Sequence, residues 1–373
     1  MFAPARFRAV RSLAAATIAA SLLGPVPATA GAVPPSLSSL PALSSDLLGQ
    51  QDQTSEQDHR AEYLGRFDFG AQNTDPSIGG LSGIDQSGDG YIAISDDKNE
   101  HGPIRAYRFQ ADDEREFQAT ETVPLTQSDG EDYTGYIDAE EIRELPNGNL
   151  LWTTEGKAKD GDAVPPQLIE STADGHEVRR IDVPSYHQPD GHEHTGVYDN
   201  NGPEAMTRPP GGQYALTVNE NALAQDGSKN SDTEPSLNRV TIYDLETGQP
   251  AAEYVLPVEA QRGVTSALTD EDGNLYILQR GYLKDIGENR AEIYKVDLSG
   301  ADDVLGKESL DGTEATAQKD LVFDFATVEP HPDNVEGMAW GPHNEDGSRT
   351  LFVVSDDNFN DSQSTLFHAL KLN

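Results

Sequence analysis

One pattern of residues recurs five times along the 373-residue chain, and this repeat constrains the fold more than any other feature. Each copy places a small residue or a carboxylate before a short apolar stretch, then a turn, then a hydrophobic stretch that ends in polar residues. The turns lie at 87–90, 146–148, 210–212, 271–273 and 345–347. Repeats of tens of residues are typical of solenoids and propellers, and these stretches show no helical period. The sequence therefore predicts an all-β fold built from repeated sheets.

Two further strands follow each of the first four copies, so the predicted repeating unit is a four-stranded sheet. These strands are expected at 104–109 and 116–123, 167–171 and 177–183, 239–245 and 252–258, and 292–298 and 321–325. The fifth copy has only one, at 366–372, and its missing strand is available at 63–69. A pair of β-sandwiches would not need the repeat to continue around the chain. We predict a single β-propeller at 61–373, closed by its N-terminal strand, with five blades, or six if a loop hides one.

Topology gathers acidic residues at one end of the predicted blades. Antiparallel pairing puts the start of the innermost strand and the end of the second strand at the same end of a blade. The first position holds Ser82, Glu140, Glu204, Thr265 and Glu336, and the second holds Asp96, Glu155, Glu220, Arg280 and Asp356. One mouth of the central channel thus collects seven carboxylates and one arginine. The other mouth is expected to receive only turns.

Carboxylates that converge near one axis raise one another's pKa unless a cation neutralises them. The sequence contains no Cys, and a set of oxygen ligands suits a hard cation such as Ca²⁺. We predict a calcium site formed by Asp96, Glu140, Glu204, Glu336 and Asp356. The sequence leaves open the alternative that these acids cap strands or accept hydrogen bonds from loop amides. Arg280 either pairs with Glu336 or Glu220 or receives an anionic group of a substrate.

The charge balance and the N-terminal sequence indicate which partners the protein can bind and in which compartment we expect it. With 65 acidic residues against 26 Lys and Arg, the formal charge is −39, which argues against binding to nucleic acid or to an anionic membrane. Residues 1–30 combine an Arg-bearing start, an apolar run at 12–24 and the small-residue site Ala28-Thr29-Ala30, which predicts a secretory signal peptide. The apolar run is short for a membrane span. Residues 31–60 are typical of a disordered linker. We expect a secreted monomer, periplasmic if the source cell has an outer membrane.

Several motifs of the repeats resemble those of one family of secreted propellers. They are Gly80-Leu81-Ser82-Gly83-Ile84 with Ser95-Asp96-Asp97, Asp138-Ala139-Glu140 with Thr154-Glu155, and Asn334-Val335-Glu336-Gly337-Met338-Ala339 with Ser355-Asp356-Asp357. Together they resemble the phytase-like family, also called esterase-like activity of phytase, over about residues 61–372. The resemblance implies an extracellular propeller, hydrolysis of phosphoesters or other esters, and dependence on calcium. The sequence lacks the Asp-Asp-Pro-Ala motif and the clustered Lys and Arg of the alkaline propeller phytases.

These observations favour a secreted, calcium-dependent hydrolase that acts on a small ester or phosphoester. In this hypothesis the metal activates a water molecule, Glu155 or Glu220 is the general base, and Arg280 stabilises the developing anion. One alternative is a non-catalytic propeller that binds a glycan, a peptide or a cell-wall partner at the same mouth. A second alternative is a lactonase-like metal hydrolase.

Overall fold

The described residues fold almost entirely into antiparallel strands. The computed structural model describes residues 60–229, 233–328 and 332–373. The predicted signal peptide at 1–30, and the predicted linker up to residue 59, lie outside the described residues. Helical structure within the described ranges is limited to α1 (Phe69–Gln72) and the 3-10 turns η2 (Ser185–His187) and η3 (Phe325–Thr327). None of these helices is long or apolar enough to cross a bilayer.

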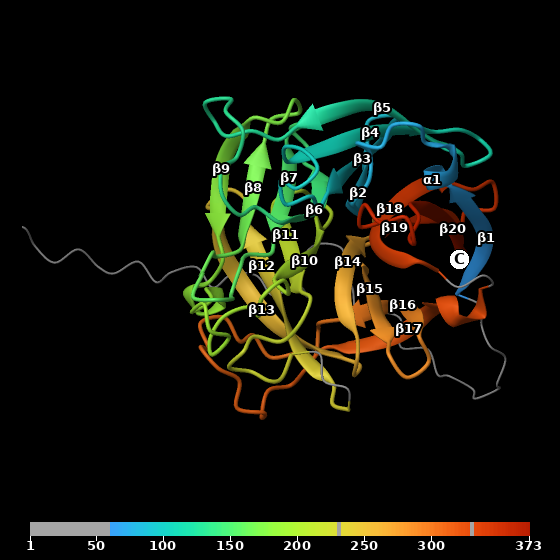
Figure 1. The fold of residues 1–373 in the computed structure, drawn as a ribbon. Helices are drawn as coiled ribbons and strands as arrows, with labels where there is room; N and C mark the ends of the chain where they lie inside the picture. Colours follow the sequence, from blue (N-terminus) through green and yellow to red (C-terminus); the bar gives the residue numbers. More distant parts are fainter. Residues whose placement is uncertain (1–59, 230–232, 329–331) are drawn as a thin grey trace, which may run out of the picture. The chain divides into compact units, whose positions relative to one another are not determined.

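The strands form five four-stranded sheets, four of which are built from strands that follow one another along the chain (Figure 1). The first blade comprises β2 (Leu81–Ser87), β3 (Gly90–Ser95), β4 (Arg105–Ala111) and β5 (Phe117–Pro124). The second comprises β6 (Ala139–Glu144), β7 (Leu150–Thr154), β8 (Gln167–Ser171) and β9 (Glu177–Asp182). The third comprises β10 (Pro203–Thr207), β11 (Tyr214–Asn219), β12 (Ser236–Asp244) and β13 (Gln249–Val258). The fourth comprises β14 (Gly263–Thr269), β15 (Leu275–Leu283), β16 (Glu288–Asp297) and β17 (Gln318–Asp324).

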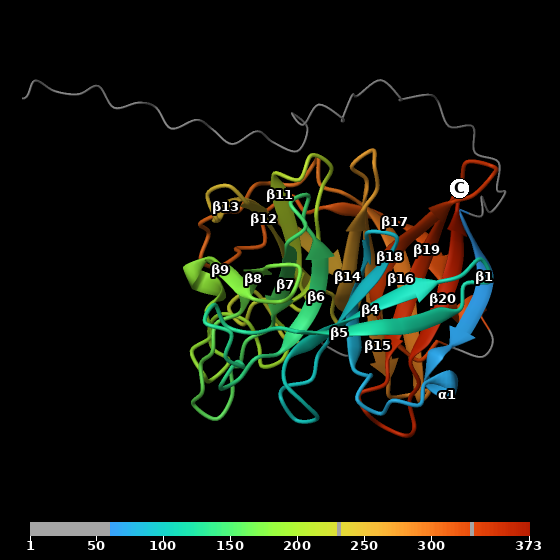
Figure 2. The same cartoon turned by 90° about the horizontal axis from the view of Figure 1, so that it is seen from above.

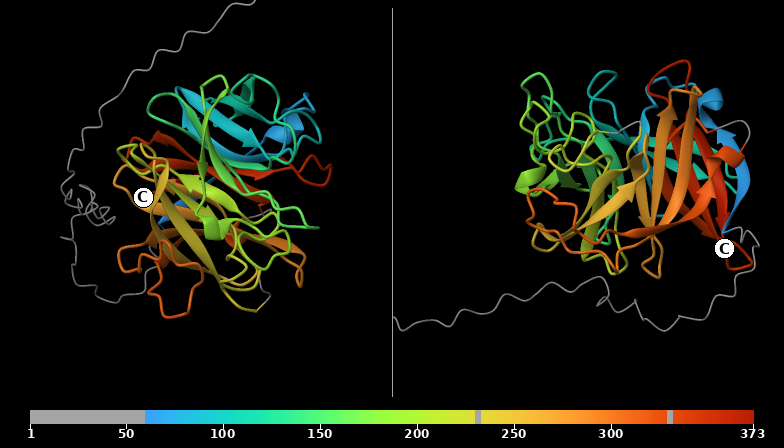
Figure 3. Two further views of the ribbon diagram at one scale, coloured as in Figure 1. Left: turned by 90° about the vertical axis from the view of Figure 1, so that its left-hand side faces the viewer. Right: turned by 90° about the horizontal axis from the view of Figure 1, so that it is seen from below.

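The fifth blade combines the two ends of the described chain. It comprises β18 (Asn334–His343), β19 (Arg349–Asp356), β20 (Leu366–Leu372) and, outermost, β1 (Ala61–Asp68). β1 pairs antiparallel with β20 along its whole length, and the two strands lie side by side in Figure 2 and Figure 3. The predicted ring closure is therefore confirmed. The blade count is five, so the possible sixth blade is not present among the described strands.

The innermost strands β2, β6, β10, β14 and β18 contact one another in ring order and surround a common centre in Figure 1. Apolar side chains fill the space between neighbouring blades. Ile92 and Ile94 of β3, for example, belong to one buried cluster with Ile142 of β6 and Trp152 of β7. Each inner sheet is thus covered on both faces, which explains why its strands are continuous hydrophobic runs rather than alternating ones. The resulting propeller confirms the predicted fold class.

Candidate functional site

A β-bulge interrupts the innermost strand of every blade near the same end. In β2, Leu81 pairs with Ser95 and Gly83 with Ile94, so Ser82 is left out of the register. The equivalent shifts leave out Glu140 and Glu141 in β6, Glu204 in β10, Thr265 in β14 and Glu336 in β18. A bulge turns the omitted side chain out of the regular pleat. Three of the predicted metal ligands therefore occupy the same specialised backbone position.

The second strand of each blade passes or ends beside this bulge. The backbone N–H of Glu155 donates to the Asp138 carbonyl at 3.0 Å, and that of Glu220 donates to the Gly202 carbonyl at 2.7 Å. Asp96 and Asp356 lie at the ends of the second strands of their blades in the same way, whereas Arg280 lies within β15, opposite Gly263 at the start of β14. A side chain at Gly263 would prevent this arrangement, because its Cβ would lie 2.5 Å from Glu220 Oε1. Gly263 thus leaves room for the Glu220 carboxylate beside the neighbouring blade.

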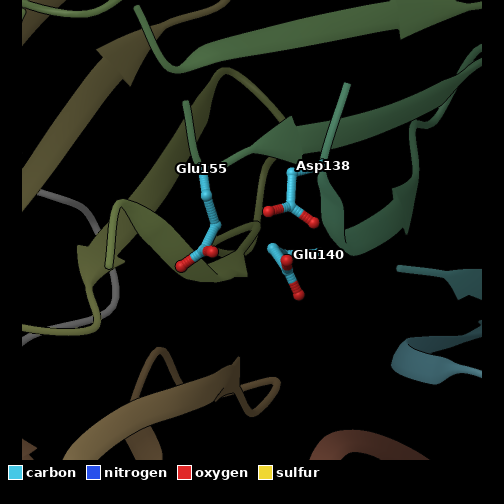
Figure 4. Close-up of side chains that lie close together, drawn as sticks. All are labelled: Asp138, Glu140 and Glu155. Atoms are coloured by element: carbon cyan, nitrogen blue, oxygen red, sulfur yellow. The ribbon is translucent and has the colours of Figure 1, made fainter. Parts of the chain in front are cut away.

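Three carboxylates of the second blade point toward one another (Figure 4). Asp138 directly precedes β6, Glu140 lies in the bulge of β6, and Glu155 directly follows β7. One oxygen from each lies within 4.8 Å of the other two. A second group of the same dimensions joins Glu155 to Glu204 and Glu220 of the third blade. Glu155 belongs to both groups and therefore lies at the centre of the carboxylate array.

The complete array contains eight carboxylates, which we call the acidic mouth. Its members are Asp96, Asp138, Glu140, Glu155, Glu204, Glu220, Glu336 and Asp356. Two cationic side chains of the described residues face it: Lys98 Nζ lies 2.9 Å from Asp138 Oδ2, and Arg280 Nη2 lies 2.5 Å from Glu336 Oε1 and 4.0 Å from Glu204 Oε1. The protein's own cations thus leave most of this negative charge uncompensated.

Burial and mutual repulsion disfavour the ionised form of these acids. Burial raises the pKa of Asp96, Glu140, Glu155, Glu204 and Asp356, and the neighbouring carboxylates raise it further. Burial also raises the pKa of Glu220 and Glu336, although the Arg280 guanidinium opposes that shift. A divalent cation would favour the ionised form at all of these positions.

Several carboxylate oxygens of the mouth are buried without a hydrogen-bond donor. Glu155 is 1% exposed, and no described residue donates to either of its oxygens. Asp138 Oδ1 and Glu204 Oε2 are likewise buried and accept nothing from the described part of the chain. A buried carboxylate without a partner is costly, whereas oxygen atoms free of other donors are suitable ligands for a hard cation. The residues present therefore fit a Ca²⁺ site.

The sequence-predicted site residues lie together, but they do not all have the same surroundings. Glu140 and Glu204 fall within the two groups around Glu155, as does Glu220. Glu336 pairs with Arg280 and accepts a hydrogen bond from Asn334 Nδ2 at 2.8 Å. The charge of Asp96 raises the pKa of Asp356, and the charge of Glu336 raises the pKa of both, so these acids belong to the side of the mouth between the fifth and first blades.

Sequence reasoning missed two members of the site, Asp138 and Lys98. Asp138 stands two residues before Glu140 and so shares its side of the strand, a spacing that could have identified it. Lys98 lies in the loop after β3 and reaches Asp138 across the boundary between the first two blades. Only the packing of those blades brings the two side chains together.

A buried ion pair lies beside the acidic mouth, and it was not predicted from the sequence. Arg143 and Glu141 of β6 form a two-pronged pair with both N···O distances at 2.9 Å. Arg143 also donates to the carbonyl of Ile84 at 2.6 Å and to that of Ala267 at 2.8 Å. Ser266 Oγ donates to Glu141 Oε2 at 2.7 Å. This axial ion pair connects the first, second and fourth blades and fixes the strands that carry the site.

Comparisons with solved structures find several chains of low sequence identity. Similar solved structures include a protein from Lactobacillus plantarum, with 13% identity and a TM-score of 0.34, covering 77% of this chain and 66% of that one, so this chain spans slightly less than two thirds of its length. An endo-arabinase from Bacteroides thetaiotaomicron has 11% identity and a TM-score of 0.44, covering 80% of this chain and 95% of that one. A gluconolactonase from Xanthomonas campestris has 9% identity and a TM-score of 0.34, covering 76% and 69%.

No curated protein matches the sequence significantly. A family model described as "Phytase-like: Esterase-like activity of phytase" matches residues 76–359. The matched region runs from before β2 to beyond β19 and includes every carboxylate of the acidic mouth. This chain therefore belongs to the phytase-like family.

Proposed function

We propose that this protein is a secreted, calcium-dependent hydrolase of small phosphate or carboxylic esters, with the acidic mouth as its active site. The observation that carries the proposal is Glu155, a carboxylate that is almost fully buried, belongs to two three-carboxylate groups and has no donor among the described residues for either oxygen. A buried carboxylate of this kind lowers the stability of the folded protein unless a cation binds it. Membership of the phytase-like family supports ester hydrolysis as the reaction.

The proposed ligands surround Glu155. The nearest oxygens belong to Asp138, Glu140 and Glu204. Further negative charge around them comes from Asp96, Glu336 and Asp356. Bound there, Ca²⁺ would polarise the ester oxygen and lower the pKa of a water ligand. Glu155 is more suitable as a ligand than as a base, because it is inaccessible to solvent and central to both groups.

Glu220 is the better candidate for the general base. It is partly exposed, unlike Glu155, and Asn201 Nδ2 donates to its Oε2, which leaves Oε1 to accept a proton from water. Arg280 is suited to stabilise the anion that develops on the ester oxygen. Its Nη2 is held by Glu336, while its Nε–H is buried and has no acceptor among the described residues.

An activity survey tests this proposal. Turnover of 4-nitrophenyl phosphate, 4-nitrophenyl acetate and a simple lactone would be measured with Ca²⁺ and with EDTA, for the wild type and for Glu204→Ala and Glu336→Ala. We expect Ca²⁺-dependent ester or phosphoester hydrolysis that both variants lose. Glu62→Ala, at an exposed position of the outermost strand β1, is the matched control and should be unaffected.

The survey also separates the alternatives. Hydrolysis of the lactone alone would identify a lactonase-like enzyme instead. Absence of turnover on all three substrates, with Ca²⁺ bound, would favour a propeller that only binds a glycan, a peptide or a cell-wall partner. If both Ala variants kept metal binding and turnover, the proposed mechanism would be wrong. The N-terminal sequence of the exported protein tests secretion, because cleavage is expected after Ala30.

A further inference from the structure

The other mouth of the channel also contains a pocket, although the sequence led us to expect only turns there. Its volume is about 250 Å³ and all five blades contribute to its lining. The residues that matter for its chemistry are Asp85, Arg143, Arg208, Thr269, Trp340 and Arg349. The axial ion pair of Arg143 and Glu141 lies between this pocket and the acidic mouth, since Glu140 and Glu141 are neighbours in the bulge of β6. We call this pocket the arginine mouth.

Two of its three arginines have their charge neutralised by acids of the protein. Arg143 is 2% exposed and is paired with Glu141. Arg349 lies 3.3 Å from Glu271 and stands over the ring of Trp340, with 4.8 Å between its guanidinium carbon and the ring centroid. These contacts hold both side chains in place.

Arg208 is different, because no ion pair or hydrogen bond joins its guanidinium to a described residue, and its Nε–H is buried. Its positive charge opposes the rise in the pKa of Asp85 that burial causes. The buried Nε–H of Arg143, which lines the same pocket, also has no acceptor among the described residues. A buried donor without an acceptor is costly, and these two N–H groups lack the partner that native proteins normally provide.

The backbone around Arg208 is fixed rather than loose. Thr269 Oγ1 donates to the Arg208 carbonyl at 2.9 Å, and the backbone N–H of Thr269 donates to Thr207 Oγ1 at 2.8 Å. These bonds tie the end of β10 to the end of β14. Arg208 is therefore held at the rim of the pocket by its backbone while its guanidinium remains available to a ligand.

We propose that the arginine mouth binds a small oxyanion that also carries a hydroxyl group, as hydrogen phosphate and the monoanions of small phosphomonoesters do. A guanidinium offers two parallel N–H groups to such an anion, and the Nε–H of Arg143 provides a further donor. Asp85 lies in the same lining and accepts a hydrogen bond from the backbone N–H of Glu144 at 2.9 Å. Burial raises the pKa of Asp85, while the charges of Arg143 and Arg208 and this hydrogen bond favour its ionised form. In that form the carboxylate would repel a plain anion but can accept a hydrogen bond from a P–OH group. The required ligand thus presents both acceptor oxygens and one O–H donor.

This site is separate from the acidic mouth and needs no cation, so it can be tested independently of the proposed function. Inorganic phosphate, glycerol 2-phosphate and acetate would each be titrated calorimetrically into the full-length protein in EDTA. We expect phosphate or the phosphomonoester to bind. The compound with the higher affinity shows whether the ligand is free phosphate or a phosphomonoester. Acetate, which lacks a donor, should bind more weakly than both.

Arg208→Gln should weaken binding by about tenfold or more, the effect expected for loss of a charged hydrogen bond. Arg208→Lys keeps the charge but loses the parallel pair of N–H groups. Its affinity should therefore lie between those of Arg208→Gln and the wild type. Arg66→Gln, at an exposed position of β1, removes the same charge elsewhere and should bind like the wild type. Equal melting temperatures without ligand would show that the variants fold.

Three results would overturn the inference. They are no detectable binding of either phosphate compound, binding that Arg208→Gln leaves unchanged, and acetate binding as tight as that of phosphate.

Discussion

At one position of every inner strand, the chain leaves the regular strand pairing and turns a side chain toward the axis. In the second, third and fifth blades that residue is a glutamate: Glu140, Glu204 or Glu336. In the first blade it is Ser82, whose hydroxyl donates to Glu140 Oε2 at 2.7 Å. The aligned repeats could reveal this position, because it precedes the turn in every repeat and holds Glu in three of them and Ser or Thr in the other two. The bulge itself could not be predicted, since it depends on the register between two strands.

Substitution of Glu220 tests the proposed general base separately from the proposed metal ligands. With Ca²⁺ at saturation, Glu220→Gln should lower kcat by about 100-fold or more, because the amide cannot accept the proton of the attacking water. The bound Ca²⁺ should remain, because Glu155 and its other neighbours are unchanged. Steady-state kinetics on the best substrate, together with a Ca²⁺ titration of the same variant, gives both values. A variant with nearly wild-type kcat would contradict the assignment of Glu220 as the base.

Residues that act across blade boundaries were beyond sequence reasoning. The pairing of Lys98 with Asp138 depends on the distance between two blades. Glu141 and Arg143 were also missed, although two opposite charges two residues apart inside an apolar strand are unusual. Their spacing indicated that they share one face of the strand, but only the closed ring shows that this face meets the axis.

Among the elements, β1 closes the propeller. Its position could be predicted because the fifth repeat lacks one strand. β1 was expected at 63–69 and occupies Ala61–Asp68. Its pairing with β20 is reinforced by Tyr63, whose hydroxyl bonds to His368 Nδ1 at 2.9 Å and whose ring stacks on Phe323 of β17 at 6.3 Å between centroids. One side chain thus connects the closing strand to both its own blade and the preceding one.

Removal of the Tyr63 hydroxyl should weaken this closure measurably. Tyr63→Phe keeps the stacked ring but loses the hydrogen bond to a buried histidine, which should lower the free energy of unfolding by about 1 kcal/mol. Tyr282→Phe is the matched control, because Tyr282 is 55% exposed. Urea denaturation of the two variants and the wild type measures the difference. Equal stability of Tyr63→Phe and the control would show that this bond does not hold the ring closed.

At the scale of the whole molecule, the acidic excess has one concentrated component. Eight of the 65 acids converge at a single mouth, where two cations oppose them. The fold class, the blade count and the closure could be predicted because each follows from a local pattern that repeats. The arginine mouth could not, because its lining residues come from five blades and none belongs to a recognisable motif.

The acidic mouth should make the stability of the protein depend on both pH and Ca²⁺. Its glutamates have folded pKa values raised above the ordinary 4.5, so the unfolded chain loses these protons first as the pH rises. In EDTA, these groups therefore lower the free energy of unfolding as the pH increases from 4.5 upward. Bound Ca²⁺ favours the ionised carboxylates and should remove this loss.

Melting temperatures measured from pH 4.5 to 8, in EDTA and in Ca²⁺, test this expectation. The many other acids of the surface affect both curves, so the difference between the curves reports on the acidic mouth. We expect the stabilisation by Ca²⁺ to grow with pH. A constant difference, or none, would contradict the coupling between these carboxylates and a cation.

The proposed function depends on the binding of a divalent cation to the acidic mouth through Glu155. Calorimetric titration of Ca²⁺ into the metal-free protein measures this binding, with Glu155→Gln as the variant and Glu62→Gln as an exposed control. We expect the wild type and the control to bind Ca²⁺ with release of protons, and Glu155→Gln to bind it at least about tenfold more weakly. A wild type that binds no Ca²⁺, or a Glu155→Gln variant that binds it as tightly as the wild type, would rule out this cation site.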